Sequence, residues 1–121
     1  YNATNIVKAI GRGFSPEKAL LLTRENHMLE IIDIKQELNA TERELEQKKG
    51  RLIGTGGKTR TEIEEKTNTA IAVYGKTVSI IGEAESVEVA KKAIGLLLGG
   101  ATHKRAYSYL SKTQSFETFE I

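Results

Sequence analysis

The spacing of apolar residues changes along the chain and predicts strands that alternate with helices. The run from Met28 to Ile34 is short and rich in isoleucine, which favours a strand. Two further apolar runs, residues 70–74 and 77–81, flank Gly75-Lys76, a two-residue sequence typical of a tight hairpin turn with glycine first. We therefore expect three strands, the last two of which form a hairpin.

The hairpin turn also predicts which face of the hairpin is buried. A two-residue turn places Ile71 opposite Ile80 and Val73 opposite Val78. Because side chains alternate across a strand, these four share one surface, and the other surface carries small residues such as Ser79. The first surface is expected to face the core, while the second stays small and polar.

Three segments have helical patterns. Thr41 and Glu44 have the spacing of a capping box at the start of a helix that runs to Ile53. A second helix is expected over residues 58–67. The strongest pattern ends at Gly99-Gly100, and its apolar residues recur every three or four positions. They are Val87, Ala90, Ala93, Ile94, Leu97 and Leu98.

From residue 28 onward the expected order is therefore β-α-α-β-β-α, an α+β fold. Three strands in one sheet bury their isoleucines when three helices cover one face. A groove is then expected between the second strand and the two helices that are joined by the glycine-rich loop described next.

Residues 51–60, which join the first two helices, form the most informative stretch of the chain. Glycine occupies positions 54, 56 and 57, which allows positive φ and brings a ligand close to the backbone amides. Five basic residues and no acidic residue lie between Lys48 and Arg60. A loop of this kind before a helix N-terminus is expected to hold the phosphate backbone of a nucleic acid.

The two ends of the chain are expected to lie outside this unit. Residues 1–26 contain two short helical patterns, the second with Ser15 as N-cap and Pro16 at the first helical position. We interpret them as the C-terminal helices of a preceding domain and a connector, with upstream sequence missing. The domain itself is expected over residues 27–100, and residues 101–121 are a basic and then acidic tail. A short docking helix in this tail is expected around Tyr107, Tyr109 and Leu110.

Composition narrows the function. The formal net charge of +2 is too small for a polycation, so a nucleic-acid surface requires local clusters of cations. Residues 103–105 and Lys112 form a second basic stretch without acids. The absence of cysteine excludes disulfides and thiol chemistry and fits a reducing, cytoplasmic location. No apolar run is long enough to span a bilayer, so no membrane association is expected.

No catalytic or metal-binding pattern is recognisable. Gly57-Lys58-Thr59 matches the end of an NTPase phosphate loop, but the leading glycine of that motif would fall at Leu52. His27 and His103 are far apart and have no carboxylates at ligand spacing. We therefore expect a binding protein that is not an enzyme and that uses neither a cofactor nor a metal.

The order of the elements and the loop resemble a type I KH domain over about residues 28–98. The resemblance rests on Ile53-Gly54-Thr55-Gly56-Gly57 at the position of the GXXG loop and on Ile71-Ala72-Val73 in the second strand. It implies that the loop clamps the phosphates of a short single-stranded segment while the bases lie on an apolar groove.

A narrower resemblance covers residues 6 to about 110. Residues 8–19, 50–54, 58–60 and 73–78 are similar to the archaeal two-KH family of small-subunit ribosome-assembly factors. Eukaryotic relatives of that family partner the PIN-domain endonuclease that trims the 3′ end of small-subunit rRNA. The resemblance implies binding of this rRNA region, a possible endonuclease partner, and an upstream KH unit of which residues 1–26 are the end.

The candidate RNA-binding residues lie in the loop and beside it. They are Gly54, Thr55, Gly56, Gly57, Lys58, Arg51, Arg60, Ile53 and Ile63. Amides at Gly56, Gly57 and Lys58 and the side chains of Arg51, Lys58 and Arg60 are expected to hold phosphates. Thr55 and Gly56 bring no cation to the centre of the loop, which leaves an alternative open. In it, the KH fold is a scaffold that recruits a nuclease or a translation initiation factor and binds RNA weakly.

Overall fold

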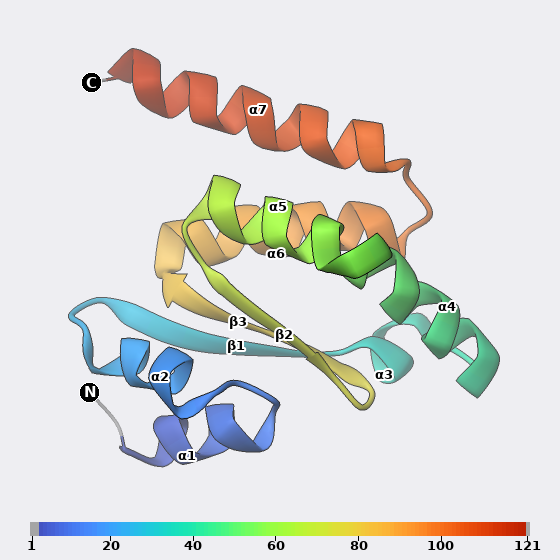
Figure 1. Ribbon diagram of the computed structural model, residues 1–121. Coiled ribbons are helices and arrows are strands. Elements are labelled where there is room, and N and C mark those ends of the chain that lie inside the picture. The colour runs from blue at the N-terminus through green and yellow to red at the C-terminus, as the bar shows by residue number, and fades with distance from the viewer. Residues whose placement is uncertain (1–2, 121) are drawn as a thin grey trace.

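The computed structural model describes the backbone of residues 3–120 and the side chains of residues 3–113. Its elements are α1 (Ala3–Gly11), α2 (Pro16–Ala19), the 3-10 helix η1 (Leu20–Thr23), β1 (His27–Asp33), α3 (Ile34–Leu38), α4 (Glu42–Ile53), the 3-10 turn η2 (Thr55–Gly57), α5 (Lys58–Thr67), β2 (Ala70–Tyr74), β3 (Thr77–Glu83), α6 (Ala84–Leu98) and α7 (His103–Glu120). The expected α+β fold is confirmed. In Figure 1, α5 and α6 lie on one side of the sheet, α1 and α2 lie on the other, and α7 forms an outer layer beyond α5 and α6.

The sheet has three antiparallel strands in the order β1-β3-β2, so β2 lies at an edge. Ile71 pairs with Ile80 and Val73 with Val78, as the hairpin turn predicts. Gly75 has a φ of 56°, the positive value that this turn requires.

The short helix α3 was not expected. Ile34 begins this helix instead of ending the first strand, because the Asp33 carboxylate accepts a hydrogen bond from the Gln36 N–H at 2.9 Å and caps the helix. The same hydrogen bond is the main reason why the pKa of Asp33 lies below its ordinary value. A favourable N-cap therefore turns the chain out of the sheet.

The main core lies between the sheet and the helices α4, α5, α6 and α7. Ile71, Val78 and Ile80 contribute the sheet side of this core. From α7, Ala106 and Leu110 are buried in it. The docking helix expected in the tail is present, but it is longer than predicted and extends over 18 residues. Its first half is an integral part of the main core.

A second core covers the opposite face of the sheet, which was expected to stay polar. Ala70, Ala72 and Ile81 pack there against the N-terminal helices. The N-terminal residues of this core are Ala9, Phe14, Ala19 and Leu22. Small side chains on this face allow the helices to approach closely, so residues 3–23 are packed onto the domain as a second layer of helices. On the outer side of α1, Val7 and Ile10 are exposed to solvent.

Within residues 3–120, none of the helices combines the length and the apolar character needed to cross a membrane. Over the same residues, no group of three or more histidine and acidic side chains is placed to hold a metal ion.

Candidate nucleic-acid interface

The GXXG loop begins where α4 ends, at a residue that must be glycine. Gly54 has φ 75° and ψ 173°, a backbone region in which side chains are rarely found. A Cβ atom at Gly54 would lie 2.3 Å from Thr59 Oγ1 and 2.8 Å from the Thr59 amide nitrogen. The turn can therefore form only because the start of α5 packs directly against a bare Cα.

The next two glycines serve a different purpose. Gly56 and Gly57 also have positive φ, 63° and 79°, but a Cβ atom at Gly56 would have no neighbour within 4 Å. Packing therefore leaves the backbone at Gly56 uncovered. Thr55 and Gly56 are exposed, and the loop presents a strip of main chain to solvent.

Two of the three amides expected to hold phosphates are used inside the loop. The Gly57 N–H donates to the Gly54 carbonyl at 3.1 Å, and the Lys58 N–H donates to the Thr55 carbonyl. These hydrogen bonds form the 3-10 turn η2, because the chain must reverse tightly between α4 and α5. The expectation for these two amides is therefore corrected.

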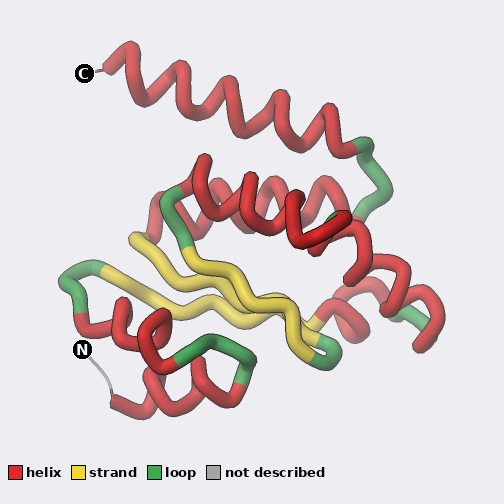
Figure 2. Tube along the Cα trace, viewed as in Figure 1, coloured by secondary structure: helices red, strands yellow, loops and turns green. Residues whose placement is uncertain are grey.

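Arg51 was expected beside the phosphates, but its guanidinium group points to another part of the domain. It donates to the carbonyl oxygen of Leu97 at 2.7 Å and to that of Ala101. Leu97 lies in the last turn of α6, where its carbonyl also accepts from the Gly100 N–H at 3.2 Å, and Ala101 lies in the connection to α7. His103 approaches the Arg51 carbonyl at 3.1 Å. Arg51 thus ties the last turn of α4 to the connection between α6 and α7, which lies next to the junction of α4 and α5 in Figure 2.

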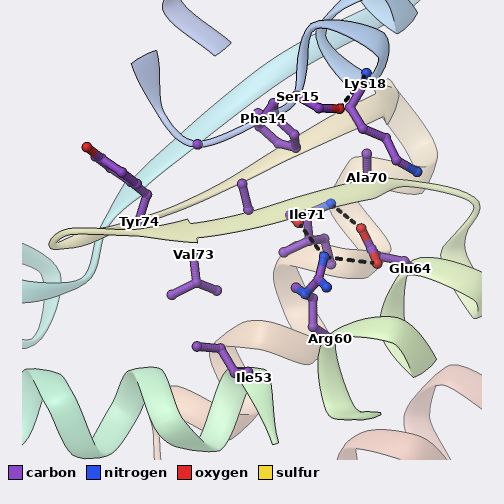
Figure 3. A pocket seen from close by; sticks show the side chains of 12 residues that line it. Phe14, Ser15, Lys18, Ile53, Arg60, Glu64, Ala70, Ile71, Val73 and Tyr74 are labelled. Atoms are coloured by element: carbon purple, nitrogen blue, oxygen red, sulfur yellow. Dashed lines mark hydrogen bonds and ion pairs between the residues drawn. The ribbon is translucent and has the colours of Figure 1, made fainter. Parts of the chain in front are cut away.

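A groove of about 410 Å³ runs along the free edge of β2. One wall comes from α4 and α5, through Ile53, Arg60 and Glu64, and the opposite wall comes from residues 13–18 (Figure 3). Because side chains alternate across a strand, Ile71 and Val73 face the first wall, and their neighbours in β2 face the second. The expected groove between the loop-flanking helices and the second strand is therefore present.

Ile53 and Ile63 were both expected to contact bases, but only Ile53 is placed to do so. Ile53 is half-buried and lines the groove close to Val73 (Figure 3). Ile63 is 1% exposed and belongs to the main core. Its place one turn beyond Thr59 on the inner face of α5 explains this, so its expected contact is corrected.

Two side chains of α5 occupy the edge of β2 at Ile71. The Glu64 carboxylate accepts a hydrogen bond from the Ile71 N–H at 2.7 Å. Arg60 donates to the Ile71 carbonyl at 3.3 Å and also pairs with Glu64 at 3.5 Å. In an antiparallel edge strand every second residue directs its N–H and C=O away from the sheet. Val73, two residues further on, therefore presents its own peptide groups to the groove.

An aromatic side chain lies at the far end of the groove. Tyr74 is 53% exposed, and the guanidinium of Arg12 lies 5.4 Å from the centre of its ring. Gly13, with a φ of 99°, brings the chain so close that a Cβ atom there would lie 3.1 Å from the Tyr74 Cβ. The pair provides a planar, positively charged surface on which a base could stack.

Sequence reasoning missed this wall and this end of the groove. The residues concerned are Gly13, Phe14, Ser15, Lys18 and Tyr74. Residues 13–18 were missed because residues 1–26 were interpreted as the end of another domain, and Tyr74 was missed because the second face of the hairpin was expected to stay small and polar. A signal was present, since residues 8–19 carry part of the resemblance to the ribosome-assembly family.

The sequence matches a family model described as the eukaryotic-type KH domain (KH-domain type I), the second KH domain of PNO1, over residues 28–115. The chain belongs to this KH-domain family. The match extends into α7, in agreement with the burial of Ala106 and Leu110.

Several archaeal proteins are similar to this KH protein. A KH domain-containing protein of Methanocaldococcus jannaschii is 45% identical over 112 residues, which are 93% of this chain and 49% of that protein. A protein of unknown function from Aeropyrum pernix has a crystal structure with 40% identity and a TM-score of 0.92, over 98% of this chain and 62% of that one.

Two structures from Pyrococcus horikoshii OT3 are also similar. Dim2p is 45% identical with a TM-score of 0.83, over 91% of this chain and 63% of that chain. A chain in the complex of a/eIF2alpha, aDim2p and rRNA is 44% identical with a TM-score of 0.87, over 93% of this chain and 61% of that chain. The KH protein therefore spans about half to three fifths of the length of these relatives.

Proposed function

We propose that this KH domain binds single-stranded RNA in the groove beside its GXXG loop, and that its target is the 3′ region of small-subunit rRNA during ribosome assembly. The observation that carries the proposal is the position of the loop: an uncovered strip of main chain at Thr55 and Gly56 adjoins a groove along the open edge of β2. A strand can thus be held by its phosphates at one side and by its bases at the other.

Phosphates are held at the loop by a small set of groups. The exposed Lys58 has no ion-pair partner among the described residues and lies at the N-terminus of α5, where the helix dipole adds to its charge. The main chain at Gly56 and Gly57 allows the strand to approach closely. Arg60 adds a second cation inside the groove. Gly54 acts by shaping the turn, and Arg51 and Ile63 are not included in this contact set.

Bases lie along β2. Ile53 and Val73 provide an apolar surface, and the outward peptide groups of Val73 can hydrogen-bond to a base edge. At the end of the groove, a further base can stack on Tyr74. This mode of binding requires no catalytic group, and we propose a binding factor and not an enzyme.

The relatives support the biological setting of the proposal. A similar chain occurs in a complex that contains rRNA and a/eIF2alpha. We infer that this protein acts on rRNA in the cytoplasm, with a translation factor among its partners. We further propose that the endonuclease that trims the rRNA 3′ end is a partner, and that residues 1–26 continue from an upstream KH unit.

A second candidate function is a scaffold for protein partners with weak affinity for RNA. One observation favours it: neither Thr55 nor Gly56 is charged, and Arg51 is turned away from the loop. Lys58 and Arg60 are then the candidate cations that remain on the α5 side of the groove. The two functions differ in their salt dependence, because phosphate contacts release counterions on binding.

The test is fluorescence anisotropy with a single-stranded oligonucleotide from the 3′ end of small-subunit rRNA at two salt concentrations. The variant is Gly56→Asp, Gly57→Asp, because aspartate tolerates positive φ. A Cβ atom at Gly56 would have no neighbour within 4 Å, and one at Gly57 would meet only the Arg60 guanidinium, at 3.8 Å. The matched control is Asn39→Asp, Asn68→Asp, which adds the same two charges at exposed positive-φ residues outside the groove. We expect salt-sensitive binding by the parent and the control, and its loss in the loop variant.

Circular dichroism is measured first, to establish that both variants are folded before their RNA binding is compared. Equal binding by the loop variant and the control would contradict the proposed phosphate clamp. Weak, salt-independent binding by the parent chain would favour the scaffold function.

A further inference from the structure

A second groove lies between α6 and α7. It consists of two adjoining hollows of about 450 Å³ and 700 Å³, which share Leu96, Arg105 and Tyr109. The residues that line the groove of the GXXG loop belong to other parts of the chain. In Figure 1, α7 runs along the outer side of α6, far from β2. The two grooves are therefore distinct surfaces.

Cations gather along this second groove. Lys92 comes from α6, and Lys104, Arg105 and Lys112 come from α7. All four are exposed, and none of them forms an ion pair among the described residues. The described residues that line the two hollows include no acidic side chain. Among the described residues, no ion pair compensates the charge of these four cations.

The cations are ordered by the periodicity of α7. Lys104, Ser108 and Lys112 are four residues apart and so lie on one face, with about 6 Å of rise between successive positions. Arg105 and Tyr109 form the neighbouring row. Such rows place several charges along a line, which suits an extended anion better than a single small one.

The other side of the groove permits close approach of a ligand backbone. Three glycines, Gly95, Gly99 and Gly100, line the groove at and just beyond the last turn of α6, and a Cβ atom at Gly95 would have no neighbour within 4 Å. Tyr109 is half-buried and offers an aromatic surface beside the cations. Cations, uncovered main chain and an aromatic ring together are the features of single-strand binding surfaces.

We propose that the α6–α7 groove binds a second segment of the same RNA strand through its phosphates. The inference rests on the proposed function only in taking RNA as the polyanion. Charge complementarity with the unpaired cations selects this occupant. Lys104, Arg105 and Lys112, from the second basic stretch of the sequence, thereby obtain a role that the GXXG groove does not provide.

Arg51 connects the two surfaces. It lies three residues before Gly54, and it is hydrogen-bonded to the carbonyls of Leu97, in the last turn of α6, and of Ala101, in the connection to α7. Ala101 itself lines the second groove. An RNA strand that leaves the GXXG loop therefore has a short path over this junction to the α6–α7 groove.

The experiment compares a short RNA of six nucleotides with one of about eighteen, both from the rRNA 3′ end. The variant is Lys104→Gln, Arg105→Gln, Lys112→Gln. Its matched control is Lys8→Gln, Arg24→Gln, Arg43→Gln, which removes three exposed cations that line neither groove. Thermal unfolding is measured first to confirm that both proteins are folded.

We expect the variant to bind the long RNA about tenfold more weakly than the control, with a salt slope reduced by about 2, since three phosphate contacts each contribute about 0.7. Binding of the short RNA should be unchanged, because it fills only the GXXG groove. Equal binding of the long RNA by variant and control would overturn the proposal.

The failure of this inference is distinguishable from failure of the proposed function. The Gly56→Asp, Gly57→Asp variant tests the GXXG groove with the short RNA alone. If that variant keeps its affinity for the short RNA, the proposed clamp is wrong, whatever happens at α7. If the Gly56→Asp, Gly57→Asp variant loses its affinity for the short RNA but the α7 variant binds the long RNA as tightly as its control, the second groove does not bind RNA.

Discussion

The two helices that flank the GXXG loop place their cations differently. On the α4 side, Arg51 turns inward to the carbonyls of Leu97 and Ala101, and Lys49 pairs with Glu46 at 3.5 Å. On the α5 side, Arg60 lines the groove and pairs there with Glu64, whereas Lys58 is exposed and forms no ion pair among the described residues. The α4 side anchors the loop, and on the α5 side Lys58 is available to a ligand.

The difference shows that nearness to a binding loop in sequence does not determine a residue's role. The role is determined by the face of the helix on which the residue lies. Arg51 adjoins Leu52, a buried residue on the side of α4 that packs on the core, so its side chain reaches other parts of the domain. Lys58 and Arg60 begin a new helix whose first turn faces the loop. The predictions below test this division of the loop into an anchoring side and a binding side.

The largest expected effect is a difference in stability between variants of two loop glycines, Gly54 on the anchoring side and Gly56 on the binding side. Gly54→Ala should destabilise the domain by about 3 kcal/mol, because the Cβ clashes with Thr59 and the backbone is strained. Gly56→Ala should cost only about 1 kcal/mol, from positive φ alone. Urea unfolding of both variants measures the difference. Equal losses of stability would show that the loop has no anchoring side.

The next effect concerns Arg51. Arg51→Gln should lower the free energy of unfolding by about 2 kcal/mol, because two charge-assisted hydrogen bonds to carbonyls are lost. The RNA affinity of the folded variant should change by less than about twofold. Chemical denaturation and anisotropy test the two statements separately. A large loss of RNA affinity without loss of stability would return Arg51 to the binding side.

A smaller effect is expected at the other end of α4. Thr41→Ala should cost about 1 kcal/mol, because it removes the capping box that Thr41 forms with Glu44. The hydrogen bond from the Thr41 N–H also lowers the pKa of Glu44. Because the pKa of Glu44 is lowered in the folded state, its carboxylate stabilises the fold at pH values above the ordinary pKa of a glutamate. This contribution is lost as the pH falls through the lowered pKa of Glu44.

Urea unfolding at neutral and acidic pH measures this effect. Glu44→Gln should be less stable than the parent at neutral pH, and the difference should shrink on acidification. RNA binding at neutral pH should be unaffected in both variants, since this end of α4 lies away from the groove. A stability difference that grows in acid would contradict the role of the Glu44 carboxylate.

On the binding side, Lys58→Gln should weaken RNA binding about threefold and reduce the salt slope by about 0.7, the value for one phosphate contact to a single strand. Stability should change by less than about 0.5 kcal/mol, because Lys58 is exposed. Salt titrations by anisotropy measure the slope. An unchanged slope would remove Lys58 from the contact set.

The smallest expected effect is a gain in RNA affinity. Glu64→Gln should strengthen RNA binding about twofold at low salt, because it removes a negative charge from the groove while the amide oxygen still accepts from the Ile71 N–H. Glu65→Gln, on the exposed side of the same helix, is the control and should have no effect. A loss of affinity in Glu64→Gln would mean that the carboxylate itself contacts the RNA.

Much of the fold could be predicted because local signals agree with the tertiary structure. Gly75-Lys76 set the hairpin register, and the capping box at Thr41 marked the start of α4. The helix α3 was missed because a five-residue helix has no periodicity to detect, and only Asp33 as an N-cap signals it. The length of α7 was missed because most of its residues are polar and give a weak helical pattern. Its helix is stabilised by the packing of Ala106 and Leu110 in the main core.

The candidate site was predicted less completely, for a physical reason. The loop glycines could be identified because their conformation is a property of their own backbone. The directions of Arg51 and Ile63 depend on what other elements offer them, namely the carbonyls of Leu97 and Ala101 for Arg51 and the main core for Ile63. The wall formed by residues 13–18 depends on a layer of helices that follows only from the small side chains of Ala70 and Ala72.

The edge of β2 has a consequence for the state of the protein in solution. An apolar edge strand can template pairing with a strand of another chain, which leads to aggregation. Here Glu64 and Arg60 already occupy both peptide groups of Ile71, so only Val73 offers an open pair. A strand from another chain needs the free N–H and C=O groups of several residues along the edge, whereas a nucleobase needs those of one residue. We therefore expect the domain to admit bases at this edge while the edge resists the addition of a strand from another chain.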